Sequence, residues 1–109
     1  MALSGYRLMW LMVMFDLPVV TKRERKAATG FRKFLLDQGF EMAQFSVYQR
    51  FCAGKEQAET YTRRIGQNLP RTGKVHMLMF TDRQYENIVC FDGRRRSAAR
   101  ENPSQFALF

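Results

Sequence analysis

The sequence predicts an α+β fold of the ferredoxin-like type, a βαββαβ sandwich with one additional strand near the C-terminus. Apolar runs typical of buried strands alternate with segments of helical spacing, in the order strand, helix, strand, strand, helix, strand. In that order both helices cover one face of an antiparallel sheet. The length of 109 residues is close to the commonest size of one domain. We therefore expect one domain over residues 1–93, followed by a basic tail with an apolar end at residues 94–109.

The first strand is predicted at Leu8–Phe15, an unbroken apolar run. Apolar and polar residues would alternate if one face met water, so this strand is expected to be buried on both faces. The run is far too short to span a bilayer. Asp16 follows where the chain leaves the core, and an acid in this place is either a turn and cap residue or a ligand.

The first helix is predicted to begin at Thr21, because Thr21 and Glu24 have the spacing of a capping box. Gly39 offers the left-handed conformation that ends a helix near Gln38. Between these limits apolar residues recur at helical spacing. The predicted inward face carries Ala27, Ala28, Phe31, Phe34, Leu35 and Gln38.

The opposite face of this helix is predicted to be basic. At about 3.6 residues per turn, it gathers Lys22, Arg25, Lys26, Thr29 and Lys33. A solvated helix face usually carries both signs of charge, but Glu24 is the sole acid between Thr21 and Leu36. The formal net charge of +8 also favours a polyanionic partner for a folded chain. We therefore expect phosphate contacts from five residues, Lys22, Arg23, Arg25, Lys26 and Lys33.

Two strands are predicted next, at Phe40–Ala43 and Phe45–Phe51. We favour a tight corner between them over one long strand with a bulge near Gln44. In the second strand, the residues predicted to face inward are Phe45, Val47, Gln49 and Phe51.

A second helix and a fourth strand follow at Lys55–Leu69 and Val75–Thr81. Pro70 is expected to stop the helix. The strand is apolar on both faces, which predicts a central or covered position in the sheet. His76 has no second His or Cys at ligand spacing, so we interpret it as a packed or exposed side chain and not as a metal ligand.

Ile88–Phe91 is predicted to be a fifth strand, which either returns to its own sheet or crosses to a second copy of the chain. The end of the chain, Arg94–Arg100 and then Phe106–Phe109, is either a frayed tail or a foot that docks on a partner. The sequence has two cysteines, Cys52 and Cys90, and no secretory signal is evident in it. We therefore expect the protein to work in a reducing cytoplasm, without a membrane partner.

Four ordered motifs make the sequence recognisable as a whole. They are Met14–Pro18, Glu24–Lys26 with Phe31–Leu35, Gly39–Phe40 with Gln44–Tyr48, and Thr81–Tyr85. Through them the chain resembles, from Tyr6 to Gly93, the small adaptation subunit of CRISPR systems, the second of the two near-universal CRISPR-associated proteins. The motifs Phe15–Pro18 and Gln44–Tyr48 are similar to those of the branch found in type II systems.

The resemblance implies a homodimer held between two dimers of the CRISPR integrase, in a complex that carries double-stranded foreign DNA for insertion into the repeat array. It also implies a Mg²⁺-dependent endonuclease that acts on RNA or DNA, with single-stranded RNA as a further partner. In that scheme Asp16 is the catalytic and metal-binding residue, facing its symmetry mate so that the pair holds Mg²⁺ for phosphodiester hydrolysis. Ser46 matches a family serine and is expected to hydrogen-bond near that site.

The chain departs from the family's nuclease pattern at Leu17–Pro18, where many relatives carry a second polar or acidic residue. One carboxylate per chain gives a metal ion few protein ligands, so two hypotheses about function remain. The first is an architectural DNA-binding subunit of spacer acquisition whose C-terminal tail meets the integrase. The second is a metal-dependent endoribonuclease as the primary role. A ferredoxin-like RNA-binding module is disfavoured because the aromatic motifs of such modules are not evident.

Overall fold

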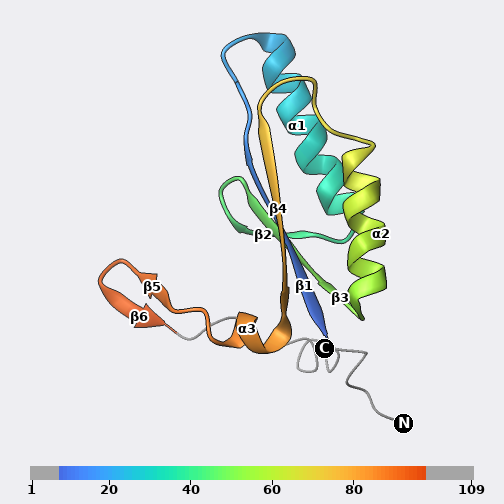
Figure 1. Ribbon diagram of the computed structural model, residues 1–109. Helices are drawn as coiled ribbons and strands as arrows, with labels where there is room; N and C mark the ends of the chain where they lie inside the picture. The colour runs from blue at the N-terminus through green and yellow to red at the C-terminus, as the bar shows by residue number, and fades with distance from the viewer. Residues whose placement is uncertain (1–7, 98–109) are drawn as a thin grey trace.

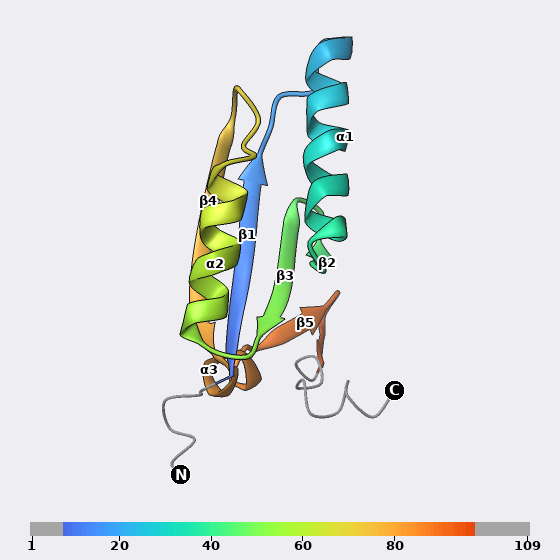
Figure 2. The ribbon, with the colours of Figure 1, turned by 90° about the vertical axis from the view of Figure 1, so that its right-hand side faces the viewer.

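A computed structural model of the chain describes residues 8–97 (Figure 1). Four strands form one antiparallel sheet in the order β2-β3-β1-β4. Their bounds are Met9–Asp16 for β1, Glu41–Gln44 for β2, Val47–Cys52 for β3 and Lys74–Thr81 for β4. The helices α1 (Lys22–Asp37) and α2 (Lys55–Gly66) lie side by side on one face of this sheet (Figure 2). The predicted α+β ferredoxin-like fold is confirmed.

The central strand β1 supplies the middle of the core. Leu11, Val13 and Phe15 are buried on the side of the sheet that faces the helices, where they pack with Phe31 and Leu35 of α1. Alternate residues of β1 point to the other face, where Trp10 is buried but Met12 and Met14 are only half-buried. The predicted burial on both faces therefore holds for part of the strand.

The first helix has the predicted limits. The backbone N–H of Glu24 donates to Thr21 Oγ1 at 3.1 Å, and the N–H of Thr21 donates to Glu24 Oε1 at 2.9 Å. Gly39 follows the C-cap with φ +86°. Ala28, Phe31 and Leu35 are buried as predicted, but Ala27 is exposed because it lies at the margin of the inward face, beside the α2–β4 loop.

The inward face of β3 was predicted wrongly. Tyr48 and Cys52 are buried toward the helices, whereas Val47, Gln49 and Phe51 pair with the residues of β1 that point away from them. Phe45 is not in the strand but in the tight β2–β3 turn, and its side chain is 82% exposed. Both faces of β3 are largely apolar. The alternation of side chains along a strand shows which residues share a face, but here it does not show which face the helices cover.

The position of β4 also differs from the prediction. Within residues 8–97 it pairs with β1 alone, so it is an edge strand, and Leu78 and Met79 on its two faces are exposed. The end of α2 is Gly66 instead of Leu69, whose side chain is 49% exposed beyond the helix.

After β4 the chain forms a short helix, α3 (Asp82–Glu86), and a hairpin of β5 (Cys90–Asp92) and β6 (Arg95–Ser97). The helix was not predicted; its own capping box joins Thr81 and Gln84. The hairpin projects away from the four-stranded sheet (Figure 1). Of the predicted fifth strand, Cys90 and Phe91 lie in β5, which pairs with β6 and not with the four-stranded sheet, while Ile88 and Val89 precede it. Arg95–Ser97 of the predicted tail form β6, and Phe106–Phe109 lie outside the described residues.

No helix in the described part of the chain is both long and apolar enough to cross a bilayer. The two cysteines are free; Cys52 is buried and Cys90 is half-buried. Burial raises the pKa of the Cys52 thiol, although the neighbouring Arg50 opposes this effect.

Candidate nucleic-acid interface and metal site

Asp16 is the last residue of β1, and its side chain is exposed. In the β1–β4 register Asp16 lies opposite Lys74, and Met14 lies opposite His76. Residues two apart in a strand share a face, so all four lie on the sheet face that points away from α1 and α2. The structure thus places the candidate ligand where the chain leaves the core, as the sequence predicts.

The Asp16 end of this face contains an open hollow of about 350 Å³. Its lining residues are Met14, Phe15, Asp16, Phe45, Ser46, Val47, Lys74 and His76. The β2–β3 turn is held against β1 here, because the N–H of Phe15 donates to the carbonyl of Ser46 at 3.0 Å. Ser46 has φ +63°, a conformation that residues with a side chain rarely adopt. The structure therefore brings Ser46 into the same hollow as Asp16.

Gly73 fixes the backbone of Asp16 from the other side, and the sequence analysis did not single it out. Its φ is +95°, and a Cβ there would lie 2.7 Å from the Asp16 carbonyl oxygen and 2.8 Å from Leu17 Cδ2. Only a residue without a side chain allows the α2–β4 loop to come this close. A glycine two residues before the predicted strand Val75–Thr81 was the available signal.

The donor set around Asp16 fits Mg²⁺ only in part. Mg²⁺ binds oxygen ligands and usually takes one or two carboxylates together with several waters. Within the described residues, no group of three or more His, Cys, Asp or Glu side chains is close enough to hold a metal ion. The exposed side chains of Lys74 and His76 line the same hollow. The lining of this hollow thus offers a metal ion one carboxylate, that of Asp16.

The second candidate surface is the outer face of α1. The exposed cations there are Lys22, Arg25, Lys26 and Lys33. The first three border a shallow hollow together with Thr29 and Gly30. This surface lies opposite the buried side of the helix, so α1 has an apolar inner face and a basic outer face.

Arg25 also has a structural role. Its Nη1 donates to the carbonyl of Val20 at 2.7 Å and approaches that of Val19 at 3.4 Å. In the same loop, Oε1 of Glu24 accepts the N–H groups of Val20 and Thr21 at 3.0 and 2.9 Å. Arg25 therefore helps to hold the β1–α1 loop, whereas Lys22 and Lys26 are better probes of ligand binding.

The cations of α1 lie at the unfavourable end of the helix dipole. Lys22, Arg23 and Arg25 are within its first four residues, and its last turn contains Asp37 and no basic residue. The N-terminus of a helix carries partial positive charge, so each such cation costs about 0.3–1 kcal/mol at low salt. The same arrangement attracts anions. The charge pattern of α1 favours binding of a polyanion over stability of the free chain.

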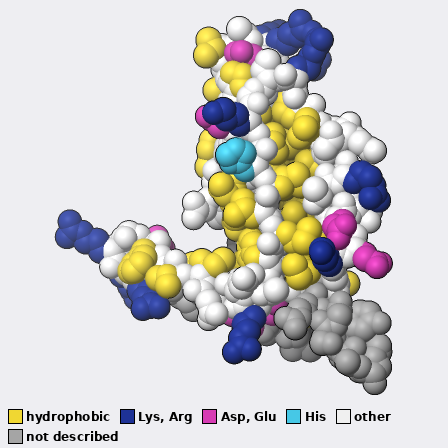
Figure 3. Space-filling model, in the orientation of Figure 1, with side chains coloured by type: hydrophobic (Ala, Val, Ile, Leu, Met, Phe, Trp, Pro, Cys, Tyr) yellow, Lys and Arg dark blue, Asp and Glu magenta, His cyan; other side chains and the backbone are white. Residues whose placement is uncertain are grey.

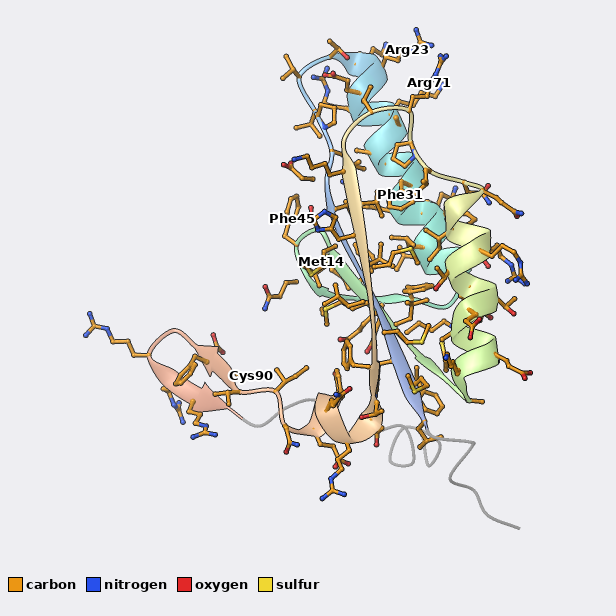
Figure 4. The ribbon with its side chains drawn as sticks, viewed as in Figure 1. Met14, Arg23, Phe31, Phe45, Arg71 and Cys90 are labelled. Atoms are coloured by element: carbon orange, nitrogen blue, oxygen red, sulfur yellow. The ribbon has the colours of Figure 1, made fainter. Side chains whose placement is uncertain are left out.

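Arg23 does not share the outer face. It lies about 100° around the helix from Lys22 and borders a different hollow. Arg71, from the α2–β4 loop, lines that hollow too, and both arginines project at the same end of the molecule (Figure 4). Dark blue side chains gather at this end in Figure 3. The sequence analysis missed Arg71, because an isolated loop arginine gives no periodic signal.

Comparisons with known proteins identify relatives over almost the whole chain. A family model described as CRISPR associated protein Cas2 matches residues 9–88. A protein of Paracidovorax avenae named CRISPR-associated endoribonuclease Cas2 is 61% identical over 107 residues, covering 98% of this chain and 99% of the relative. A protein of the same name from Flavobacterium psychrophilum is 46% identical, and the match covers 98% of this chain and 93% of that protein. Another from Parvibaculum lavamentivorans is also 46% identical, and the match covers 93% of this chain and 100% of that protein.

Proposed function

This chain belongs to the Cas2 family of CRISPR-associated proteins, and on that premise we propose that it is a subunit of the spacer-acquisition machinery. In this role it dimerises, binds a duplex of foreign DNA and bridges two dimers of the CRISPR integrase. The observation that carries the proposal is the basic outer face of α1, whose first-turn cations oppose the helix dipole.

The outer face of α1 suits the backbone of a duplex. Lys22 and Lys33 are separated by roughly 16 Å along the helix axis, which is about the axial rise of five base pairs of a DNA duplex. Both side chains are exposed. Contacts of this kind give affinity without reading the base sequence, as a protein that accepts foreign DNA of any sequence requires.

The proposed dimer places a second copy against the open sheet face and the β4 edge. Met12, Met14 and Leu78 leave apolar surface there, and Ile88, Val89 and Phe91 expose apolar surface on and beside the projecting hairpin. Exposed apolar surface and a free strand edge are features that a partner chain covers. The C-terminal tail is proposed to meet the integrase.

A metal-dependent endonuclease acting on RNA or DNA, with single-stranded RNA as a further partner, is the second candidate function. Asp16 is exposed beside a hollow, and the relatives are named endoribonucleases. When bound, Mg²⁺ would stabilise the negative charge on the phosphate oxygens and would lower the pKa of a bound water. Asp16 from each copy would hold the ion, and without it the two carboxylates would repel each other. Ser46, in the same hollow, would hydrogen-bond beside them.

We further propose that the protein works in the cytoplasm, since two free cysteines suit a reducing compartment. The similarity of Phe15–Pro18 and Gln44–Tyr48 to one branch of the family supports a type II system.

Asp16→Ala separates the two functions when it is assayed twice, for cleavage of RNA and DNA with Mg²⁺ and for spacer acquisition in cells. Asp37→Ala, which removes another exposed carboxylate, is the matched control. We expect acquisition to persist in Asp16→Ala, even if cleavage disappears. Loss of acquisition in a folded Asp16→Ala protein that still binds the integrase would contradict the architectural role and favour the enzyme.

A further inference from the structure

A second basic site lies at the tip of the molecule, away from the outer face of α1. It is a hollow of about 380 Å³ between the first turns of α1 and the α2–β4 loop. Its lining residues are Thr21, Arg23, Glu24, Ala27, Arg71 and Thr72. Arg23 and Arg71 are exposed and come from segments far apart in the sequence (Figure 4).

The charge at this hollow is predominantly positive. Glu24 is the one acid among its lining residues. The Oε1 atom of Glu24 already accepts the N–H groups of Val20 and Thr21, which orients this carboxylate toward the helix cap. The two guanidinium groups are thus the main polar groups available to a ligand.

The backbone segments that carry the two arginines are held in a fixed relation. Arg71 lies two residues before Gly73, which packs against the Asp16 carbonyl and Leu17 at the start of the β1–α1 connection. The capping box at Thr21 fixes the other end of that connection, next to Arg23. A backbone that is already in place loses less conformational entropy when a ligand binds.

We propose that Arg23 and Arg71 together bind a phosphate of the nucleic-acid backbone, as a clamp that continues the basic outer face of α1 around the tip of the molecule. A guanidinium presents a planar fork of donors that matches a phosphate, and two forks bind one phosphate or two neighbouring phosphates. Arg71 lies on the loop that also touches Asp16, so the clamp holds the nucleic acid at the Asp16 end of the sheet. This inference rests on the proposed nucleic-acid binding.

The test compares Arg71→Glu with Arg63→Glu, a matched charge reversal of an exposed arginine on α2. Binding of a duplex DNA and of a single-stranded RNA of the same length is measured over a range of salt concentrations. We expect Arg71→Glu to weaken binding about tenfold more than Arg63→Glu at low salt, with a salt slope smaller by about one unit. Weakening with only one probe supports the clamp and identifies the nucleic acid that it holds.

A double-mutant cycle with Arg23→Ala and Arg71→Ala tests whether both arginines contact the same segment of the nucleic acid. If they do, the double substitution should weaken binding by less than the sum of the two single effects on the binding free energy. Circular dichroism verifies that each variant is folded. If Arg71→Glu binds like Arg63→Glu while Lys22→Glu binds weakly, the clamp is wrong and the proposed function stands. If the unsubstituted protein binds neither probe, both are wrong.

Discussion

The two helices cover the same face of the sheet, but their charges run in opposite directions. In α2, Glu56 lies in the first turn and Arg63 and Arg64 lie in the last, an arrangement that complements the helix dipole. In α1, cations crowd the first turn and Asp37 ends the helix. Apart from Lys55 at its first position, the charges of α2 stabilise its fold, whereas the cations of α1 destabilise the free protein and favour an anionic ligand.

The N-terminal caps of the two helices differ as well, and here α1 has the more favourable arrangement. The N-terminus of α1 has a complete capping box, whereas the N-cap of α2 is Gly54, which makes no side-chain cap bond. At the other end of α1, Arg50 Nη1 donates to the Gln38 carbonyl at 3.1 Å, so β3 supplies the cation that the helix itself lacks. Local capping and a neighbouring strand thus offset the unfavourable charges of α1.

Removal of one aromatic contact from each helix should have the largest effect. Phe31 of α1 is 4% exposed and meets Phe15 at a centroid distance of 5.3 Å. We expect Phe31→Ala to lower the free energy of unfolding by about 3–5 kcal/mol. Tyr61→Ala on α2 should cost less, because Tyr61 is half-buried between Arg50 and Arg64. Urea unfolding measures both, and a greater loss for Tyr61→Ala would show that α2 is the better anchored helix.

The caps should give the next largest effect. Thr21→Ala removes the side chain that accepts the Glu24 N–H, and we expect a loss of about 1–2 kcal/mol. Gly54→Ser should stabilise α2 by a few tenths of a kcal/mol, because the backbone there is extended and a Cβ meets nothing within 4 Å. Thermal unfolding of the two variants, read against the unsubstituted chain, is the measurement. Equal and small effects would mean that the capping box of α1 does not offset its charges.

Charge reversal at the first residue of each helix should give the smallest change in stability. Lys22→Glu and Lys55→Glu each place an acid at a helix N-terminus. We expect each to raise the free energy of unfolding by about 0.3–1 kcal/mol in low salt, and the gain to fade as salt screens the charge. A loss of stability in Lys22→Glu at low salt would show that Lys22 stabilises the free chain.

Local signals predicted α1 and Asp16 well. The capping box at Thr21 and the left-handed Gly39 are short-range features, so the sequence alone located both ends of the helix. Asp16 was located because an apolar run ends there. The role of Asp16 as a metal ligand stays a prediction, because it depends on a partner and not on the local sequence.

The errors arose where tertiary packing decides the outcome. Both faces of β3 are largely apolar, and only packing against α1 and α2 determines that Tyr48 and Cys52 point toward the helices. The apolar faces of β4 gave the pattern of a central strand, although the sheet leaves it at an edge. Arg71 became a candidate binding residue only in the folded chain, where its loop lies beside Arg23.

The most direct test of the central claim is the affinity of Lys22→Glu and Lys55→Glu for duplex DNA as a function of salt. The two substitutions make the same charge change at the same position of two helices, so only the surface differs. The account predicts that Lys22→Glu binds more weakly, with a salt slope smaller by about one unit, and that Lys55→Glu binds like the unsubstituted protein. Equal affinities for the two variants would contradict it and would show that the DNA does not lie on the outer face of α1.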